Sequence, residues 1–235
     1  MLMLILSLFV ISDVNQDIEA VLKKVENRFA EGSMSADMEG AMEMNQMGMA
    51  MKMSYTGQVI RLDDTHMRTT MNMDMDMGQQ KMQNNMLIVW DGTTSWIENQ
   101  MMGQTMVIKG TIEEIKGSNQ SRFDMGKMVE SLKEMADWES MKEEGDMVIL
   151  KGKVKAEKSS ENPMLAQATD ITVSLHKNDV LPMTVEYTNA EKSIMKVVMK
   201  NPKPLTDEQK SEAFYQYTPP EGVMVMDFKD MPQMQ

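Results

Sequence analysis

The feature of this sequence that most limits its fold is methionine at every second position. Residues 71–78 read MNMDMDMG, and residues 42–53 read MEMNQMGMAMKM. Side chains two positions apart lie on the same face of a β-strand, so this spacing predicts strands with one methionine face and one polar face. The chain holds 33 methionines, although valine and isoleucine suit strands better than methionine does. The choice of methionine therefore needs a reason of its own.

The parity of the methionines changes once along the first of these runs. Met47, Met49, Met51 and Met53 share one parity, whereas Met42 and Met44 have the other. This change predicts a β-bulge near Asn45–Gln46.

The period of two begins at about residue 36 and continues for about seventy residues, which predicts an antiparallel meander. Turn signals divide it at Thr56–Gly57, Asp63–Asp64, Gly78, Asp91–Gly92 and Met102–Gly103. Trp90 and Trp96 stand on either side of the Asp91–Gly92 turn and are expected to flank one end of that hairpin.

Two helices are predicted from apolar stripes of helical spacing, one over about 14–30 and one over about 124–136. Their stripes are Val14, Ile18, Val21, Leu22, Val25 and Phe29 in the first helix, and Met125, Met128, Val129, Leu132 and Met135 in the second. A second set of strand patterns follows between residues 147 and 200, and a loop with one helical turn precedes a last short strand. This order predicts an α+β fold with one strongly curved antiparallel sheet and both helices on its concave face.

The N-terminal stretch 1–12, MLMLILSLFVIS, is apolar and of the length of a signal-peptide core. We expect a signal-peptide-like segment over 1–12, a single carrier-type domain over 13–235, and a periplasmic or otherwise exported protein. No cysteine follows this segment, so the mature chain is not expected to carry a lipid anchor.

Composition excludes several classes of function. A formal net charge of -12 without a local basic stripe argues against nucleic acid as a partner. None of the common catalytic or nucleotide-binding motifs is present, and the two histidines, His66 and His176, are isolated in the sequence. We therefore predict a non-enzymatic, monomeric protein without a cofactor.

Three stretches resemble the LolA/LolB family of lipoprotein carriers in order and spacing: YTGQVIRLDDTHMR, NNMLIVWDGTTSWIEN and EAFYQYTPPEGVMVMDF. The motif residues of the last are Phe214, Tyr217, Pro219, Pro220, Gly222 and Val223. The resemblance implies a half-open antiparallel β-barrel, closed over by helices, whose hydrophobic interior accepts the acyl chains of a lipoprotein. It also leaves room for a membrane-bound partner that loads or receives the cargo. One departure is that Asp63–Asp64 stands where the family's classical carrier has an arginine, which latches its helical lid, followed by proline.

The methionine face then becomes a candidate cavity wall, because flexible thioether side chains suit partners of variable shape such as acyl chains. The predicted cavity residues are Met49, Met51, Met53, Met71, Met73, Met75, Met77, Ile88, Trp90, Trp96, Met128 and Leu132. Two other functions remain open. Thioethers at alternate positions, about 7 Å apart on one strand, can converge on Cu(I) or Ag(I). A purely structural β module is the third possibility.

Overall fold

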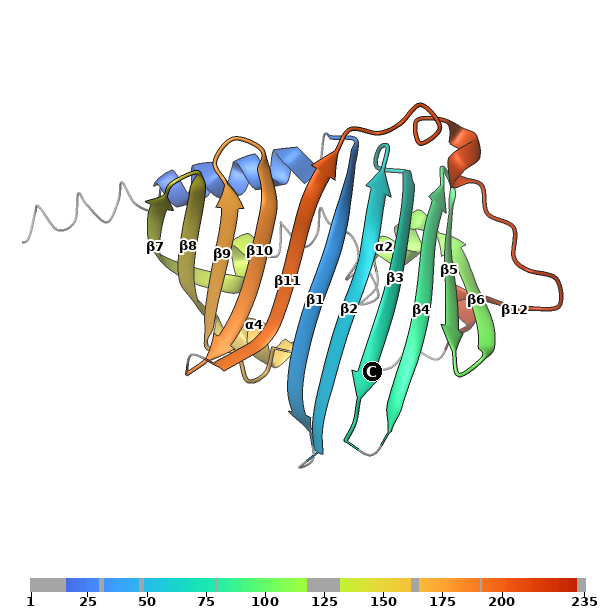
Figure 1. The fold of residues 1–235 in the computed structure, drawn as a ribbon, viewed down its shortest axis with the longest axis horizontal. Coiled ribbons are helices and arrows are strands. Elements are labelled where there is room, and N and C mark those ends of the chain that lie inside the picture. The colour runs from blue at the N-terminus through green and yellow to red at the C-terminus, as the bar shows by residue number, and fades with distance from the viewer. Residues whose placement is uncertain are drawn as a thin grey trace, which may run out of the picture. The chain divides into compact units, whose positions relative to one another are not determined.

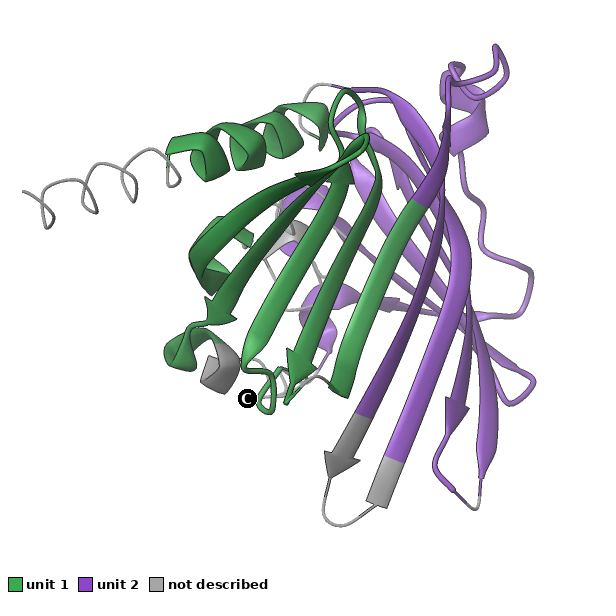
Figure 2. Cartoon of the chain, turned by 60° about the vertical axis from the view of Figure 1, so that its left-hand side comes forward, with its two compact units in different colours: residues 1–30, 125–199 green, residues 31–124, 200–235 purple. Residues whose placement is uncertain are grey.

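The computed structural model describes residues 16–29, 32–46, 49–78, 80–117, 132–161, 165–190 and 192–231. The chain divides into two compact units (Figure 2). Unit 1 comprises Met1–Ala30 and Met125–Met199, and unit 2 comprises Glu31–Asp124 and Lys200–Gln235. The signal-like segment 1–12 lies outside the described residues, and the single domain expected over 13–235 stays a prediction.

Unit 2 is a β-meander followed by a returning edge strand (Figure 1). Its strands are β1 (Met34–Gln46), β2 (Met49–Arg61), β3 (His66–Asp76), β4 (Lys81–Asp91), β5 (Thr94–Met101), β6 (Gln104–Thr111) and β12 (Met224–Asp227). Each strand from β1 to β6 pairs antiparallel with the next, and β12 pairs parallel with β6. Within the described part of unit 2 the strand order is β12-β6-β5-β4-β3-β2-β1, with no pairing between β12 and β1, so the sheet of this unit is open.

Short helical segments interrupt unit 2 after its strands. Helix α2 (Ile112–Gly117) begins with a capping box, in which Thr111 and Glu114 each accept a hydrogen bond from the other's backbone N–H. Two single-turn 3-10 helices follow near the C-terminus, η2 (Glu212–Tyr215) and η3 (Phe228–Asp230). The predicted helical turn and last short strand of this region correspond to η2 and β12 and are confirmed.

Unit 1 combines a second meander with helices. Its strands are β7 (Ala136–Glu144), β8 (Met147–Val154), β9 (Asp170–His176), β10 (Val180–Asn189) and β11 (Lys192–Lys203), whose last four residues belong to unit 2. They lie in the order β11-β10-β9-β8-β7, and the short helix α4 (Ala156–Glu161) connects β8 to β9. Leu150, Val173 and Val185 are 3% exposed or less and form part of the core of this unit.

The predicted N-terminal helix is observed over 16–29 and buries Ile18, Leu22, Val25 and Phe29 of the predicted stripe. Val21 is half-buried, and Val14 lies outside the described residues. Of the second predicted helix, only residues 132–135 are described as helical before β7 begins. Glu26 of the first helix forms an ion pair with Lys133, so the two helical segments are in contact within unit 1. No described helix combines the length and the apolarity that a membrane crossing requires.

Two local predictions are wrong. Thr56–Gly57 is not a turn, because both residues lie inside β2, where Gly57 pairs with Met71. The change of methionine parity is not a bulge at Asn45–Gln46 either. Gln46 at the end of β1 pairs with Met49 at the start of β2, so the two parities belong to two different strands that share one face. The fold class itself, α+β with a mostly antiparallel and open sheet, is confirmed.

Candidate functional site: the methionine face of unit 2

The pairing register places the methionines of β1 to β6 on one face of the unit 2 sheet, because directly opposed residues of neighbouring strands share a face. We call this the methionine face. Its described methionines are Met34, Met38, Met42, Met51, Met53, Met67, Met71, Met73, Met75, Met82, Met86, Met101 and Met106. The alternation predicted from sequence is thus present in three dimensions, across six strands.

The composition of this face changes along the strands. One cross-strand row contains Ala36, Val59, Thr69, Ile88, Ile97 and Ile108, all of them buried. Nearer the other end of the strands, the row Met42, Met53, Met75 and Met82 consists of methionine alone, and three of its four members are half-buried. The buried end of the face, which we call the closed end, therefore holds branched side chains together with the fully buried Met34 and Met67, and half-buried thioethers line the more accessible end.

The structure accounts for the predicted cavity residues individually. Met51, Met53, Met73 and Met75 are half-buried on the methionine face, and Met71, Ile88 and Trp90 are buried there. Met77 follows the end of β3, and Met49 occupies the first position of β2. Leu132 is 1% exposed but belongs to unit 1, and Met128 lies outside the described residues.

Trp90 and Trp96 do not share a face, contrary to their common assignment to one wall. Trp90 pairs with Ser95, and Trp96 pairs with Val89. Because paired residues share a face and neighbours along a strand alternate, the two indoles lie on opposite sides of the β4–β5 hairpin. Trp90 is 5% exposed on the methionine face. Trp96 lies on the other face and donates a 2.9 Å hydrogen bond from its Nε1 to Asp91.

The opposite face carries the exposed polar side chains of these strands, such as Lys52 and Asp74, and we call it the polar face. At its closed end it is covered by the C-terminal segment. Tyr215 is fully buried, with its ring centroid 5.5 Å from that of His66, and Phe214 lies beneath the Arg68 guanidinium. The aromatic residues of this C-terminal motif thus pack on the back of the sheet.

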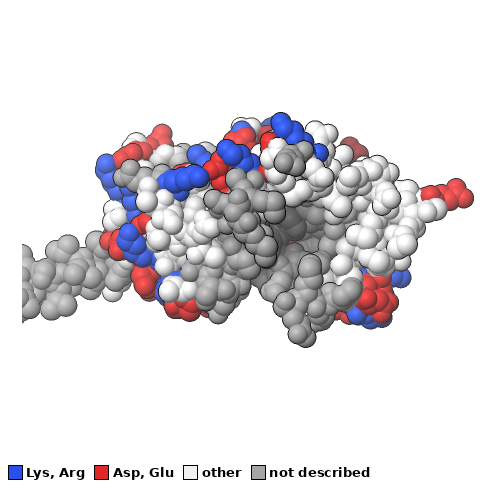
Figure 3. Space-filling model, turned by 90° about the horizontal axis from the view of Figure 1, so that it is seen from below, with Lys and Arg blue, Asp and Glu red and all other residues white. Residues whose placement is uncertain are grey.

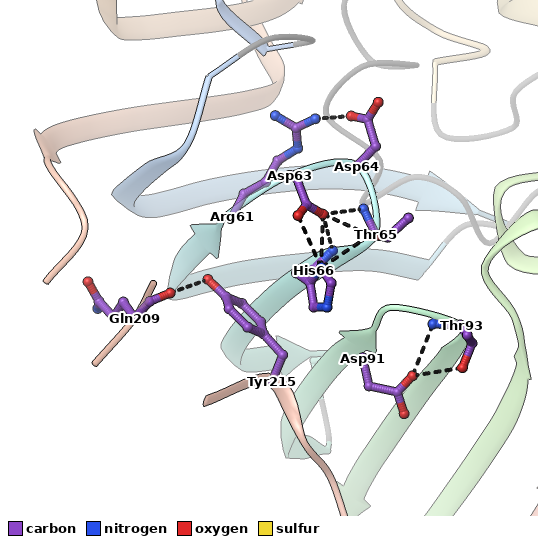
Figure 4. Close-up of polar contacts among 9 residues, drawn as sticks. All are labelled: Arg61, Asp63, Asp64, Thr65, His66, Asp91, Thr93, Gln209 and Tyr215. Atoms are coloured by element: carbon purple, nitrogen blue, oxygen red, sulfur yellow. Dashed lines mark hydrogen bonds and ion pairs between the residues drawn. The ribbon is translucent and has the colours of Figure 1, made fainter. Parts of the chain in front are cut away.

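The turn between β2 and β3 is organised by Asp63 (Figure 4). Its carboxylate accepts hydrogen bonds from Thr65 N–H and His66 N–H, each at 2.8 Å, and contacts His66 Nδ1 at 3.0 Å. Partial burial raises the pKa of Asp63, but these hydrogen bonds outweigh it and hold that pKa below 3.8. The prediction that Asp63–Asp64 marks a turn is therefore confirmed.

Arg61 also lies on the methionine face, although it was not predicted there from the sequence. It is 7% exposed at the closed end, donates a 3.0 Å hydrogen bond to the Gly32 carbonyl oxygen and pairs with Asp64. Arg61 has the same parity in β2 as Met51 and Met53, and this parity could have predicted its place on the methionine face. Asp64, which stands at the departure from the carrier pattern, is therefore an ion-pair partner of an inward-facing arginine.

A hollow of 1130 Å³ lies at the accessible end of unit 2, along β1 to β6. Most of its lining comes from the polar face, including Glu43, Lys52, Asp74, Lys81 and Gln83. The methionine row Met42, Met53, Met75 and Met82 also lines this hollow, so charged side chains and thioethers meet at the accessible end. In Figure 3, uncharged surface extends over the right of the view, where β4 to β6 run, and the turn after β5 exposes Met102 by 78%.

Histidine and acidic residues offer no metal centre in the described ranges, where no group of three or more such side chains could hold an ion. Thioether ligands are a separate matter, because the row from Met42 to Met82 places one sulfur on each of four adjacent strands.

No protein-family model matches this sequence, and no curated protein matches it. Among solved structures, the chain is similar to LprF from Mycobacterium bovis, with 12% identity over 82% of this chain and 96% of that one, at a TM-score of 0.48. It is also similar to a putative outer membrane lipoprotein-sorting protein domain from Vibrio parahaemolyticus, with 8% identity over 83% and 96% of the chains and a TM-score of 0.32. A DUF1329 family protein from Desulfovibrio piger matches over 84% and 98%, with 13% identity and a TM-score of 0.30.

At these TM-scores the likeness carries no argument about function, which has to be built on the methionine face itself.

Proposed function

We propose that this protein is a non-enzymatic carrier that binds lipid or lipoprotein acyl chains against the methionine face of unit 2. The observation that carries the proposal is the division of that face into a fully buried closed end and an accessible end of half-buried methionines. A core that only had to pack would be better served by branched side chains throughout, whereas an acyl chain of variable length needs a wall that deforms.

The cell envelope is the place where we propose that the carrier acts. The apolar segment 1–12 has the length of a signal-peptide core, and acyl chains need shielding wherever they cross an aqueous compartment. We propose a monomer that exchanges its cargo with a membrane or with a membrane-bound partner.

The decisive experiment places a charge on each face of the same strand. Met73 lies on the methionine face opposite Tyr55 and Asn84, and Asp74 is exposed on the polar face. Met73→Asp should abolish binding of a fluorescent acyl chain, since a carboxylate facing hydrocarbon costs several kcal/mol or has to take up a proton. Asp74→Asn is the matched control and should change binding little. Acyl-chain binding that survives Met73→Asp in a folded protein would refute the proposal.

A soft-metal function is the second candidate, because four methionines from adjacent strands form one row. The double variant Met73→Leu/Met75→Leu keeps volume and apolarity but removes two thioether sulfurs. A carrier should retain acyl-chain binding in this variant. Cu(I) binding that is tight in the wild type and lost in the variant, with no acyl chain bound by either, would favour the metal.

A further inference from the structure

Four polar side chains of the methionine face each have a buried oxygen atom that forms no hydrogen bond with the described residues. These atoms are Thr69 Oγ1, Asn84 Oδ1, Ser95 Oγ and Asn99 Oδ1. Asn84 is 6% exposed. A buried polar group without a partner costs stability, so each of these groups requires an explanation.

Thr69 and Ser95 have a simple structural explanation. They lie in the tightly packed closed end, where Thr69 stands between Val59 and Ile88 and Ser95 opposes Trp90. A small hydroxyl side chain fits such a place by its size, and its hydrogen can rotate. These two residues therefore do not point to a ligand.

Asn84 and Asn99 are different because they lie in the methionine rows. Asn84 pairs with Met73 on one side and with Met101 on the other, and Asn99 pairs with Met86 and Met106. Any apolar side chain would fill these positions without leaving an unmet carbonyl oxygen. Two carboxamides among thioethers are thus costly as packing elements.

The two asparagines also form a pair. Asn84 of β4 opposes Met101 of β5, and Asn99 stands two residues earlier in β5, so the two side chains are diagonal neighbours on one face. Diagonal neighbours are separated by roughly 7 to 8 Å, a distance that a single small polar group can bridge. Both unmet atoms are carbonyl oxygens, which only accept hydrogen bonds.

We propose that Asn84 and Asn99 form a polar anchor that receives a hydrogen-bond donor, a hydroxyl or an amide N–H, carried by the lipid next to its acyl chain. This inference rests on the proposed function and specifies its ligand. An apolar wall with a few convergent polar groups is the usual composition of a small-molecule site, in which the polar groups set orientation and selectivity. The methionines would hold the chain, and the asparagines would select its head.

The test compares ligands that share one acyl chain and differ only in donors. Palmitamide and 1-monopalmitoylglycerol carry N–H or O–H donors, whereas methyl palmitate carries none. Displacement of a fluorescent acyl probe from the full chain gives the three affinities. We expect the two donor ligands to bind about three- to tenfold more tightly than methyl palmitate, the range that one hydrogen bond provides.

The variants assign the selectivity to the anchor. Asn84→Leu/Asn99→Leu should remove the preference for donor ligands and leave methyl palmitate binding unchanged or tighter. Asn85→Leu is the matched control, since Asn85 is adjacent in β4 but exposed on the polar face, and it should keep the preference.

Each outcome has a distinct meaning. Equal binding of all three ligands by the wild type would overturn the anchor and leave the carrier function standing. Binding of none of them would overturn both. A preference that persists in the folded double variant would also overturn the anchor, and the wild-type comparison remains decisive if that variant does not fold.

Discussion

A Cβ atom added to Gly57 would lie 2.1 Å from the carbonyl oxygen of Thr70 on the neighbouring strand. This contact is far shorter than any van der Waals distance and involves backbone, which cannot move aside without disturbing the β2–β3 ladder. Glycine at this position therefore permits the close approach of two strands in the middle of the sheet.

Gly57→Ala should destabilise unit 2 by about 2 kcal/mol or more, because the strands would have to separate. Gly40→Ala is the control, since a Cβ there would meet the tip of the Tyr55 side chain at 2.3 Å, and that side chain can rotate. Urea denaturation of both variants checks the prediction. A smaller loss in Gly57→Ala than in Gly40→Ala would contradict it.

Gly57 also shows what sequence could and could not predict. The alternation of methionines determined which residues of β1 to β4 share a face, because a period of two has only one structural reading over such lengths. Gly57 was assigned to a turn because local signals cannot distinguish a turn glycine from one that relieves contact with a distant strand. The opposite faces of Trp90 and Trp96 depend on the register of the β4–β5 pair, which the turn geometry sets.

The same limit applies to the polar residues of the site. Arg61, Asn84 and Asn99 have inward parity in the sequence, but they are polar, and the predicted cavity residues did not include them. Only the pairing register and the burial of their atoms place them on the methionine face. Patterns of apolar residues predict cores well, and they hide the polar exceptions that carry selectivity.

Asp91 leads to a prediction about pH. Partial burial raises the pKa of its carboxyl, but hydrogen bonds from Thr94 N–H, Trp96 Nε1 and Thr93 outweigh this and hold the pKa below 3.8. A carboxyl with a lowered pKa in the folded state adds stability above its unfolded pKa and loses it as pH falls through the folded one.

Asp91→Asn should therefore be less stable than the wild type by roughly 1 to 2 kcal/mol at pH 7, because the amide cannot replace both carboxylate oxygens as acceptors. The difference should shrink as the pH falls below about 4, where the wild-type carboxyl takes up a proton. Denaturation curves at several pH values measure both. A difference that stays constant down to pH 3 would show that the charge of Asp91 is immaterial.

The two faces of the β4–β5 hairpin predict different optical responses to an acyl chain. In Trp96→Phe/Trp138→Phe, the remaining Trp90 lies on the methionine face and its emission should shift when palmitate-type ligands bind. In Trp90→Phe/Trp138→Phe, the remaining Trp96 reports from the polar face and should change little. Equal shifts from both variants would place the ligand elsewhere or indicate a change of the whole hairpin.

Methionine, unlike leucine, makes the proposed wall sensitive to oxidation. Hydrogen peroxide transfers one oxygen atom to a thioether, which yields a polar sulfoxide and water, and the rate follows the exposure of the sulfur. Among the methionines whose exposure the structure describes, Met102 and Met224, at 78% and 67%, should be oxidised first, and Met34 and Met67, at 1%, last. Peptide mapping by mass spectrometry during a peroxide time course gives this order directly.

Acyl-chain binding should survive the first phase of oxidation and fall in a second phase, when the half-buried Met73 and Met75 acquire sulfoxides, because a polar group then faces the hydrocarbon. Met73→Leu/Met75→Leu should delay the loss, since leucine has no sulfur to oxidise. Met102→Leu is the control and should leave the time course of binding unchanged. If binding fell together with oxidation of Met102 and Met224, the exposed methionines at the β5–β6 turn and on β12 would be the contact surface for the acyl chain, in place of the methionine face.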